Sequence, residues 1–340
     1  MSHGLKERSR LGDKKTARSL FSHVKWEHLF AGVSGGVIST LTLHPLDLVK
    51  VRFQVNEGLL AQGINTHRPQ YKGIVDALRT IRKTEGIKGL YQGVVPNCWG
   101  AGTAWGFYFL FYNALKVYMQ EDQKAPLGPG KHMLAATEAG LLTLVITNPI
   151  WVVKTRLCLQ YDRFSIDGTK CQKSQQYSGM VDTMTKIYKF EGIKGLYKGM
   201  LPGVFGVSHG ALQFMAYEQL KQKYNSYRER PQDCRFNSME YIMFAALSKV
   251  FAASATYPYQ VIRSRLQDQH RQYNGIADVI RQTWRNERTR GFYKGLVPYL
   301  LHVTPNICIV FLLYEQVTQL TIWKHLFNRH DDADEDELIR

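Results

Sequence analysis

The sequence predicts an all-α membrane protein with six transmembrane helices, arranged as three pseudosymmetric repeats of two helices with short surface helices inside each repeat. Three observations support this prediction: two polar motifs that each occur three times, long stretches without charged residues, and basic residues concentrated in alternate segments of the 340-residue chain. The repeating unit is about a hundred residues long, well beyond the roughly 20 to 50 residues of solenoid repeats.

The first motif is Pro-x-[Asp/Glu]-x-x-[Lys/Arg]-x-[Lys/Arg], complete in one copy and without its acid in the other two. It begins at Pro45, Pro149 and Pro258. The second motif begins with Glu and ends with an aromatic residue, a Lys or Gln, and Gly; its copies are residues 85–93, 191–199 and 287–295. Both motifs keep their order in every unit, which indicates triplication of one unit.

The second helix of each unit is predicted from a stretch without Lys, Arg, Asp or Glu. These stretches contain 23, 19 and 20 residues and occupy positions 93–115, 199–217 and 295–314. A transmembrane helix needs roughly 20 consecutive, predominantly apolar residues. Each stretch is therefore long enough to cross a bilayer.

The first helix of each unit gives a weaker signal. Residues 139–153 and 250–262 form uncharged stretches of only 15 and 13 residues, and residues 29–46 contain one His. Each stretch ends at the first motif, and ionisable side chains persist at membrane depth only where they face a cavity or pair with one another. Short apolar stretches are thus expected for helices that line a polar passage, and the predicted total is six spans.

The charge distribution supports the same topology. The chain has a net charge of +16, and residues 50–93, 154–199 and 263–295 together contain 25 Lys or Arg against 10 Asp or Glu. Basic loops are retained on one side of a membrane, so these segments are expected on one face and both termini on the other. A soluble nucleic-acid-binding protein would not confine its charge to alternate segments, and we exclude that class.

Within the basic segments, residues 73–84, 179–190 and 275–286 alternate apolar and charged side chains at helical spacing. This pattern is typical of short amphipathic helices at a membrane surface. The mean hydropathy of −0.27 is low for a membrane protein because about half of the chain is predicted to lie outside the bilayer.

The remaining features bound the organisation. The predicted divisions are an N-terminal tail at 1–25, repeats at 26–122, 131–228 and 236–325, and an acidic C-terminal tail at 326–340. A cleaved presequence is the alternative for the first tail. The five cysteines show no metal-ligand spacing, which predicts free thiols and no metal site. The sequence also contains no catalytic motif, so an enzyme is not expected.

The threefold pair of motifs resembles the mitochondrial carrier family over about residues 25–325. The variant Pro-Ile-Trp at 149–151, with Tyr-Pro-Tyr-Gln at 257–260, is similar to the folate and FAD carriers of that family, whose relatives move NAD and pyrimidine nucleotides. The resemblance implies a six-helix bundle in the mitochondrial inner membrane, with the basic loops in the matrix and both termini toward the intermembrane space. A central cavity would open alternately to either side.

The same resemblance implies the ligands and partners. The substrate would be a small anion with a planar ring, folate or FAD, carried as cargo by a monomer that has no prosthetic group. Inner-membrane lipids, with cardiolipin at the matrix-side helix ends, are the expected partners, and nucleic acid is not. An NAD or pyrimidine nucleotide carrier of the same family is the alternative, and an uncoupler or ion channel would share every feature of the fold. Exchange or one-way transport, and coupling to protons, stay open.

The family places a matrix gate at the first motif, where each proline is expected to kink its helix. Carried over to this chain, the ring would pair Asp47 with Lys154, Trp151 with Arg263, and Gln260 with Lys50. The first is an ion pair, the second a cation–π contact of about 0.5 to 2 kcal/mol, and the third a single hydrogen bond. Such a gate is weaker than a fully charged ring. The alternative for the Trp is packing against lipid.

A cytoplasmic gate is expected from an aromatic-acid-x-x-Lys pattern on the second helices. Carried over by resemblance, its residues are Asn113, Lys116, Glu218, Lys221 and Glu315. The pattern is complete only at 217–221, so one full ion pair, between Glu315 and Lys116, would remain around that ring.

The family's substrate contacts lie midway along the second helices. The corresponding residues are Gly100, Phe205, Gly206 and His302. Small residues here would leave room for a planar ring, which could stack on the Phe, whereas the His replaces the Arg of many nucleotide carriers.

Lys249 adds a cation to the predicted site because it lies 11 residues before Gln260, almost three helical turns and about 16 Å away on the same face. An ionisable residue at membrane depth is a functional candidate by default. Pairing with Glu138, or extension of the side chain toward the membrane surface, are the alternatives.

Overall fold

The computed structural model describes residues 26–57, 69–120, 128–161, 177–229, 236–271, 273–303, 305, 306 and 309. The chain divides into two compact units, Thr40–Ile307 and a smaller one formed by Met1–Ser39 and Cys308–Arg340. All copies of both motifs lie in Thr40–Ile307. The two predicted tails, Glu315 and the last part of the predicted sixth span lie outside the described residues.

The described long helices are α2 (Trp26–Val55), α5 (Val94–Met119), α6 (Pro129–Cys158), α8 (Met200–Tyr227) and α9 (Ser238–Gln267). They contain 26 to 30 residues, which at about 1.5 Å per residue corresponds to about 40 Å. This length exceeds the roughly 30 Å of a bilayer's apolar core. Residues 296–303 are also helical and begin the predicted sixth span. Among the described residues all regular structure is helical, as predicted.

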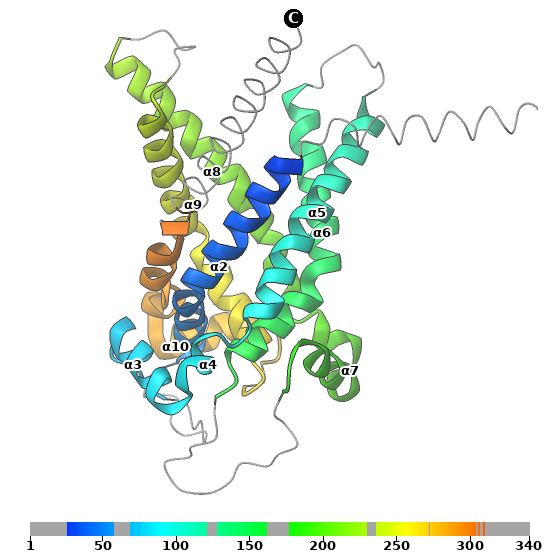
Figure 1. Cartoon of the computed structure of the whole chain (residues 1–340), viewed down its shortest axis with the longest axis vertical. Helices are drawn as coiled ribbons and strands as arrows, with labels where there is room; N and C mark the ends of the chain where they lie inside the picture. Colours follow the sequence, from blue (N-terminus) through cyan, green and yellow to red (C-terminus); the bar gives the residue numbers. More distant parts are fainter. Residues whose placement is uncertain are drawn as a thin grey trace, which may run out of the picture. The chain divides into compact units, whose positions relative to one another are not determined.

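Helices of successive repeats pack against each other. α5 lies along α6, and α8 lies along α9, as Figure 1 shows. Pro45, Pro149 and Pro258 lie inside α2, α6 and α9, and each helix continues through its proline. The predicted kinks stay a prediction.

The short helices lie within the basic segments, as predicted. They are α3 (Ile74–Thr84), α4 (Gly86–Leu90), α7 (Met180–Leu196) and α10 (Ile276–Phe292). Figure 1 shows them around the end of the long helices where both motifs lie, which we call the motif end. The apolar face of α3 buries Ala77 and Ile81 against Leu48 and Val49 of α2. In the second repeat, Ile187 of α7 belongs to a cluster with residues of α6.

A sharp corner follows the Glu of each second motif. Gly86, Gly192 and Arg288 have φ of 71°, 66° and 57° at this corner. Such left-handed backbone favours Gly because a side chain strains it. The corner separates α3 from α4 and bends α7 and α10, so all three repeats share one local geometry although the third has Arg instead of Gly.

Hydropathy ranks the helices differently from the count of charges. In the described part of the chain, one helix, Gly130–Cys158, has both the length and the mean hydropathy, 1.4, of a membrane span by composition alone. The sequence predicted this helix only weakly, because its uncharged stretch, residues 139–153, is short. α5 has a longer uncharged stretch, but its Gly, Tyr, Trp and Asn residues are less hydropathic than the Leu, Ile and Val of α6.

Candidate transport gate and substrate site

The structure brings Asp47 of α2 and Lys154 of α6 together at the motif end. The Lys Nζ lies 2.5 Å from Asp47 Oδ2, and the carboxylate belongs to a residue that is only 4% exposed. Lys50 Nζ is a second cation, 4.0 Å from Asp47 Oδ1. A buried carboxylate requires such compensation because its desolvation is costly. The ion pair links the first repeat to the second.

Trp151 has a different partner from the one expected. Its ring lies under the ammonium of Lys154, 5.5 Å from the ring centroid, while Arg263 donates a hydrogen bond of 3.1 Å to Asn148 Oδ1. The expected contact between Trp151 and Arg263 is thus replaced by a polar link one turn earlier on α6. The Asn amide offers a directional acceptor, which a ring face does not.

Lys50 and Gln260 also differ from expectation. Lys50 lies over the ring of Tyr299, 4.2 Å from its centroid, and Gln260 lies near the hydroxyls of both Tyr299 and Tyr259. Tyr299 therefore stands between the two residues that were expected to bond directly. The aromatic face attracts the ammonium by a cation–π interaction.

A set of Arg–Glu pairs was missing from the sequence interpretation. In each repeat the last cation of the first motif contacts the Glu that opens the second motif, and the pairs are Arg52 with Glu85, Arg156 with Glu191, and Arg265 with Glu287. All three Arg residues are 1% exposed. A buried, fork-shaped guanidinium suits two carboxylate oxygens, and Arg52 makes both bonds, at 2.6 and 2.7 Å. The sequence could have indicated these pairs, because the Arg and the Glu both recur at corresponding positions in all three repeats.

The electrostatic effect is clearest at Glu191, on the surface helix α7. Burial would raise the pKa of this carboxyl, but hydrogen bonds from Arg156 and Lys198 lower it from 4.5 to about 2. The side chain is therefore ionised throughout the physiological range. It anchors α7 to the end of α6.

The same Arg residues also connect neighbouring repeats. Arg52 Nε donates to the carbonyl of Cys158 at 3.1 Å, and Arg265 Nε donates to the carbonyl of Gln54 at 3.0 Å. Between the second and third repeats, the Thr155 hydroxyl donates to Gln267 Oε1 at 2.7 Å. The motif end is thus tied across all three boundaries.

The final Gly of each second motif meets the next repeat. Each of these glycines has a positive φ: 80° at Gly93, 73° at Gly199 and 85° at Gly295. The first two are the N-caps of α5 and α8, and the third directly precedes the helical residues 296–303. A Cβ on each Gly would approach the backbone carbonyl oxygen of the first of the two cations in a neighbouring first motif. The distance would be 3.1 Å to Lys154 from Gly93, 3.1 Å to Arg263 from Gly199, and 2.9 Å to Lys50 from Gly295. The two motifs therefore recur together because they touch across the repeat boundary.

The space expected at the glycines of the substrate site is filled. A Cβ on Gly100 would lie 3.3 Å from the ring of Trp151, and a Cβ on Gly206 would lie 3.0 Å from the hydroxyl of Tyr259. The expectation of open room at these positions is wrong in this conformation because large side chains of the adjacent helix occupy it. Phe205 is 64% exposed, so a ring could reach it.

The two polar residues predicted to contact the substrate, Lys249 and His302, each lack an expected partner among the described residues. Lys249 of α9 is half-buried, interacts electrostatically with His209, and has no acidic partner within the described residues. The alternative partner Glu138 is exposed and forms no ion pair in that part of the chain. His302 Nδ1 is buried without a hydrogen-bond partner in the described structure, near Asp47 and Lys50.

The expected cytoplasmic gate is only partly described. Asn113 is exposed, while Lys116, Glu218 and Lys221 are half-buried and form no ion pair among the described residues. Lys221 lies over the ring of Phe236 at 5.9 Å. Their expected role stays a prediction.

A threefold repeat of helix pairs with linked polar motifs at one end is a carrier architecture. The chain matches the family model described as mitochondrial carrier protein over residues 22–123, 125–228 and 235–325, and it belongs to this family. Members are transporters, so the chain is a transporter rather than an enzyme, and it uses no prosthetic cofactor.

Individual relatives cover almost the whole chain. The folate transporter 1, chloroplastic, of Arabidopsis thaliana is 42% identical over 308 residues, 87% of this chain and 96% of the relative. The nicotinamide adenine dinucleotide transporter 1, chloroplastic, of the same plant is 36% identical over 86% of this chain and 91% of its own. The mitochondrial FAD carrier protein of Saccharomyces cerevisiae is 31% identical over 86% of this chain and 96% of its own.

Proposed function

We propose that the protein carries folate, with FAD as a second cargo, between the two sides of the mitochondrial inner membrane by alternating access through a central cavity. The observation that carries the proposal is the 42% identity with a folate transporter over 96% of that relative's length. The identity with an FAD carrier, 31% over a similar length, supports the second cargo.

The chemistry of the candidate site suits this substrate class. Folate combines a planar pteridine ring with glutamate carboxylates, and FAD combines a planar ring with two phosphates. We assign the anionic part to Lys249 and the ring to the exposed face of Phe205, with His302 Nδ1 as a hydrogen-bonding group. A half-buried ammonium without an acidic partner in the described structure attracts an anion because that anion offsets its desolvation. Gly100 and Gly206 would contribute only if Trp151 and Tyr259 move.

The proposed gate works through the motif end. The ion pair of Asp47 with Lys154 closes the matrix side in the conformation described, and it must break when the cavity opens there. Two of the three repeat boundaries have no ion pair at this level among the described residues, so opening breaks one buried pair within the ring of first-motif residues rather than three. This arrangement favours a low barrier to exchange between the two states.

The direct test is uptake by purified protein in liposomes of labelled folate, FAD, NAD and UTP. We expect saturable uptake of folate, or of folate and FAD, above that of the other two. Uptake of NAD or UTP alone would overturn the assignment. Proton leak or ion current without any organic substrate would instead indicate an uncoupler or channel.

Lys249→Gln separates the site from the scaffold in the same assay. We expect a higher apparent KM for folate with little change in maximal rate, because the substitution removes an anion contact but no gate residue. The matched control is Lys223→Gln, which changes an exposed Lys of α8. An unaltered KM in the Lys249 variant would remove this residue from the site.

NAD is the alternative cargo to folate and FAD. The identity of 36% with an NAD transporter over 91% of that relative supports it. NAD carries two phosphates and two planar rings, so the same cation and aromatic residue could contact it. The uptake assay with competing unlabelled substrates distinguishes the two cargoes.

We also propose an inner-membrane location with cardiolipin at the motif end. A pocket of about 350 Å³ is lined by residues 91–96, 157, 160 and 177–180. The N-caps of α5 and α7, Gly93 and Gly179, border it, and neither makes a side-chain capping bond. Exposed backbone N–H groups at helix N-termini bind phosphate, which suits the headgroup of an acidic phospholipid.

A further inference from the structure

The boundary between the third and first repeats has no ion pair at the level of the predicted gate within the described residues. The acid position of the third motif is Gln260, whose amide carries no charge. Lys50 lies instead over Tyr299 and within 4.0 Å of Asp47 on its own helix. Such contacts do not join the two repeats by opposite charges.

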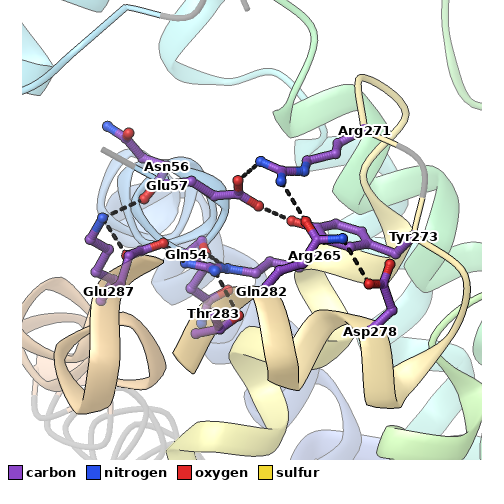
Figure 2. Close-up of polar contacts among 11 residues, drawn as sticks. Gln54, Asn56, Glu57, Arg265, Arg271, Tyr273, Asp278, Gln282, Thr283 and Glu287 are labelled. Carbon is purple, nitrogen blue, oxygen red and sulfur yellow. Dashed lines mark hydrogen bonds and ion pairs between the residues drawn. The ribbon is translucent and has the colours of Figure 1, made fainter. Parts of the chain in front are cut away.

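A buried ion pair crosses this same boundary just beyond the end of α2. The side chain of Glu57 is 6% exposed and forms an ion pair with Arg271. Its other carboxylate oxygen accepts a hydrogen bond from the hydroxyl of Tyr273, as Figure 2 shows. Arg271 and Tyr273 lie between α9 and α10, in the third repeat. The boundary between the third and first repeats therefore has an ion pair here, although it has none between Gln260 and Lys50.

The cation of this pair is held in place by its own repeat. Arg271 Nη2 donates to Gln282 Oε1 at 2.5 Å, and Gln282 Nε2 donates to Asp278 Oδ1 at 2.8 Å. The backbone N–H of Asn274 donates to the same Asp at 3.1 Å. Figure 2 shows this chain of side chains from α10 toward Glu57. A preoriented guanidinium loses less rotamer freedom when it forms the pair.

The main chain of the first repeat is fixed beside it. Lys294 Nζ donates to the carbonyl of Asn56 at 2.7 Å, and Arg265 Nε donates to the carbonyl of Gln54 at 3.0 Å. Glu57 therefore projects from a segment that the third repeat already holds. The Glu57 carboxylate therefore contacts Arg271 and is largely shielded from solvent.

The position of Glu57 is acidic in one repeat only. It lies 12 residues after its motif proline, and the equivalent residues are Tyr161 and His270. Their rings contact each other, with centroids 5.7 Å apart, at the boundary between the second and third repeats. The acid thus occurs only in the repeat that faces Gln260.

We propose that Glu57, Arg271 and Tyr273 form a displaced gate that closes the third repeat against the first, in place of the ion pair that Gln260 cannot make with Lys50. The inference rests on the proposed alternating access but not on the identity of the cargo. Opening toward the motif end must separate Glu57 from Arg271.

The buried Cys158 provides a reporter. It is 0% exposed, its Sγ contacts the carbonyl of Gln92 at 3.4 Å, and its own carbonyl accepts from Arg52 of α2. We therefore expect a movement of α2 away from α6 to uncover the thiol. In a parent variant that keeps Cys158 as its only cysteine, reconstituted in nanodiscs without substrate, the rate of labelling by a maleimide measures opening of the motif end.

We expect Glu57→Gln and Arg271→Gln each to raise this labelling rate by about tenfold or more, because breaking a buried ion pair disfavours the closed state. Tyr273→Phe, which removes one hydroxyl, should raise it less and supplies the test if the charge variants do not fold. Gln260→Glu, added to Glu57→Gln, should return the rate toward the parent value by giving Lys50 an acidic partner. Glu229→Gln, at an exposed acid, is the control.

Unchanged labelling in the Glu57, Arg271 and Tyr273 variants would overturn the displaced gate. A raised rate that Gln260→Glu does not reduce would also overturn it, because the residues would then act in general stability and not in closure. Labelling needs no cargo, so a failure to transport folate leaves this result interpretable.

Discussion

At the scale of single residues, the contact that most constrains the site is the pair between Asp47 and Lys154. A carboxylate that is only 4% exposed cannot lose its main cation without remaining as an uncompensated buried charge. Lys50, at 4.0 Å, is too distant to replace the hydrogen bond of 2.5 Å. We therefore expect the pair to matter for folding and for the proposed gate.

Lys154→Ala should lower the free energy of unfolding by about 3 kcal/mol or more, the range for breaking a buried pair, and should bias or abolish transport. Denaturation in detergent and liposome uptake measure the two effects. Lys186→Ala is the matched control, because Lys186 forms a partly exposed i,i+4 pair with Asp182 that solvent screens. Unchanged uptake in the Lys154 variant would refute the gate assignment.

At the scale of elements, the start of each second helix depends on a left-handed Gly packed against the next repeat. Gly295 shows this most tightly, because a Cβ would meet the Tyr257 hydroxyl at 2.8 Å and the Lys50 carbonyl oxygen at 2.9 Å. The carbonyl belongs to the backbone and cannot rotate away. The close approach of two chains is the reason for Gly here.

Gly295→Ala should destabilise the protein by at least about 2 kcal/mol, through backbone strain and the clash together. The thermal unfolding temperature of the purified protein measures this. Gly73→Ala is the control, since that residue has extended backbone and open space around its Cα, and it should lower stability much less, by no more than the small cost of Ala at a helix N-cap. Equal unfolding temperatures for the two variants would contradict the packing argument.

The attachment of α7 to α6 should depend on pH through Glu191. Its pKa in the folded chain is about 2, against an ordinary 4.5, so the unfolded chain binds the proton more readily. The stabilisation is complete above about pH 4.5 and is lost as the pH falls toward 2. The unfolding temperature of the wild type should therefore fall more steeply with acid than that of Glu191→Gln. Parallel curves would show that the pair contributes nothing measurable.

At the scale of the whole unit Thr40–Ile307, the three repeats share positive-φ corners and Gly contacts but differ in the ion pairs between repeats. All three boundaries share the Gly-to-carbonyl approach, yet an ion pair of Asp47 with Lys154 crosses the first, and one of Glu57 with Arg271 crosses the third. At the second, the described residues form hydrogen bonds without an opposite charge, such as the bond from Arg263 to the neutral amide of Asn148. Unequal boundaries suit an asymmetric cargo, because different parts of it meet different side chains.

Much of this organisation was predictable from the sequence. The helical class, the three repeats and the surface helices follow from charge, length and periodicity, which are local properties of the chain. The pair of Asp47 with Lys154 was also predictable, because a complete motif and the threefold repeat fix both positions. Family resemblance supplied the pairing rule.

Only the tertiary structure decided the rest, because those contacts join residues that are far apart in the chain. No local pattern shows that Trp151 fills the space beside Gly100 or that Tyr299 stands between Lys50 and Gln260. Glu57 lies outside both motifs, and its partner Arg271 lies 214 positions further along the chain. The sequence by itself determined which repeats exist and where their charges are; packing between repeats decided which charges meet.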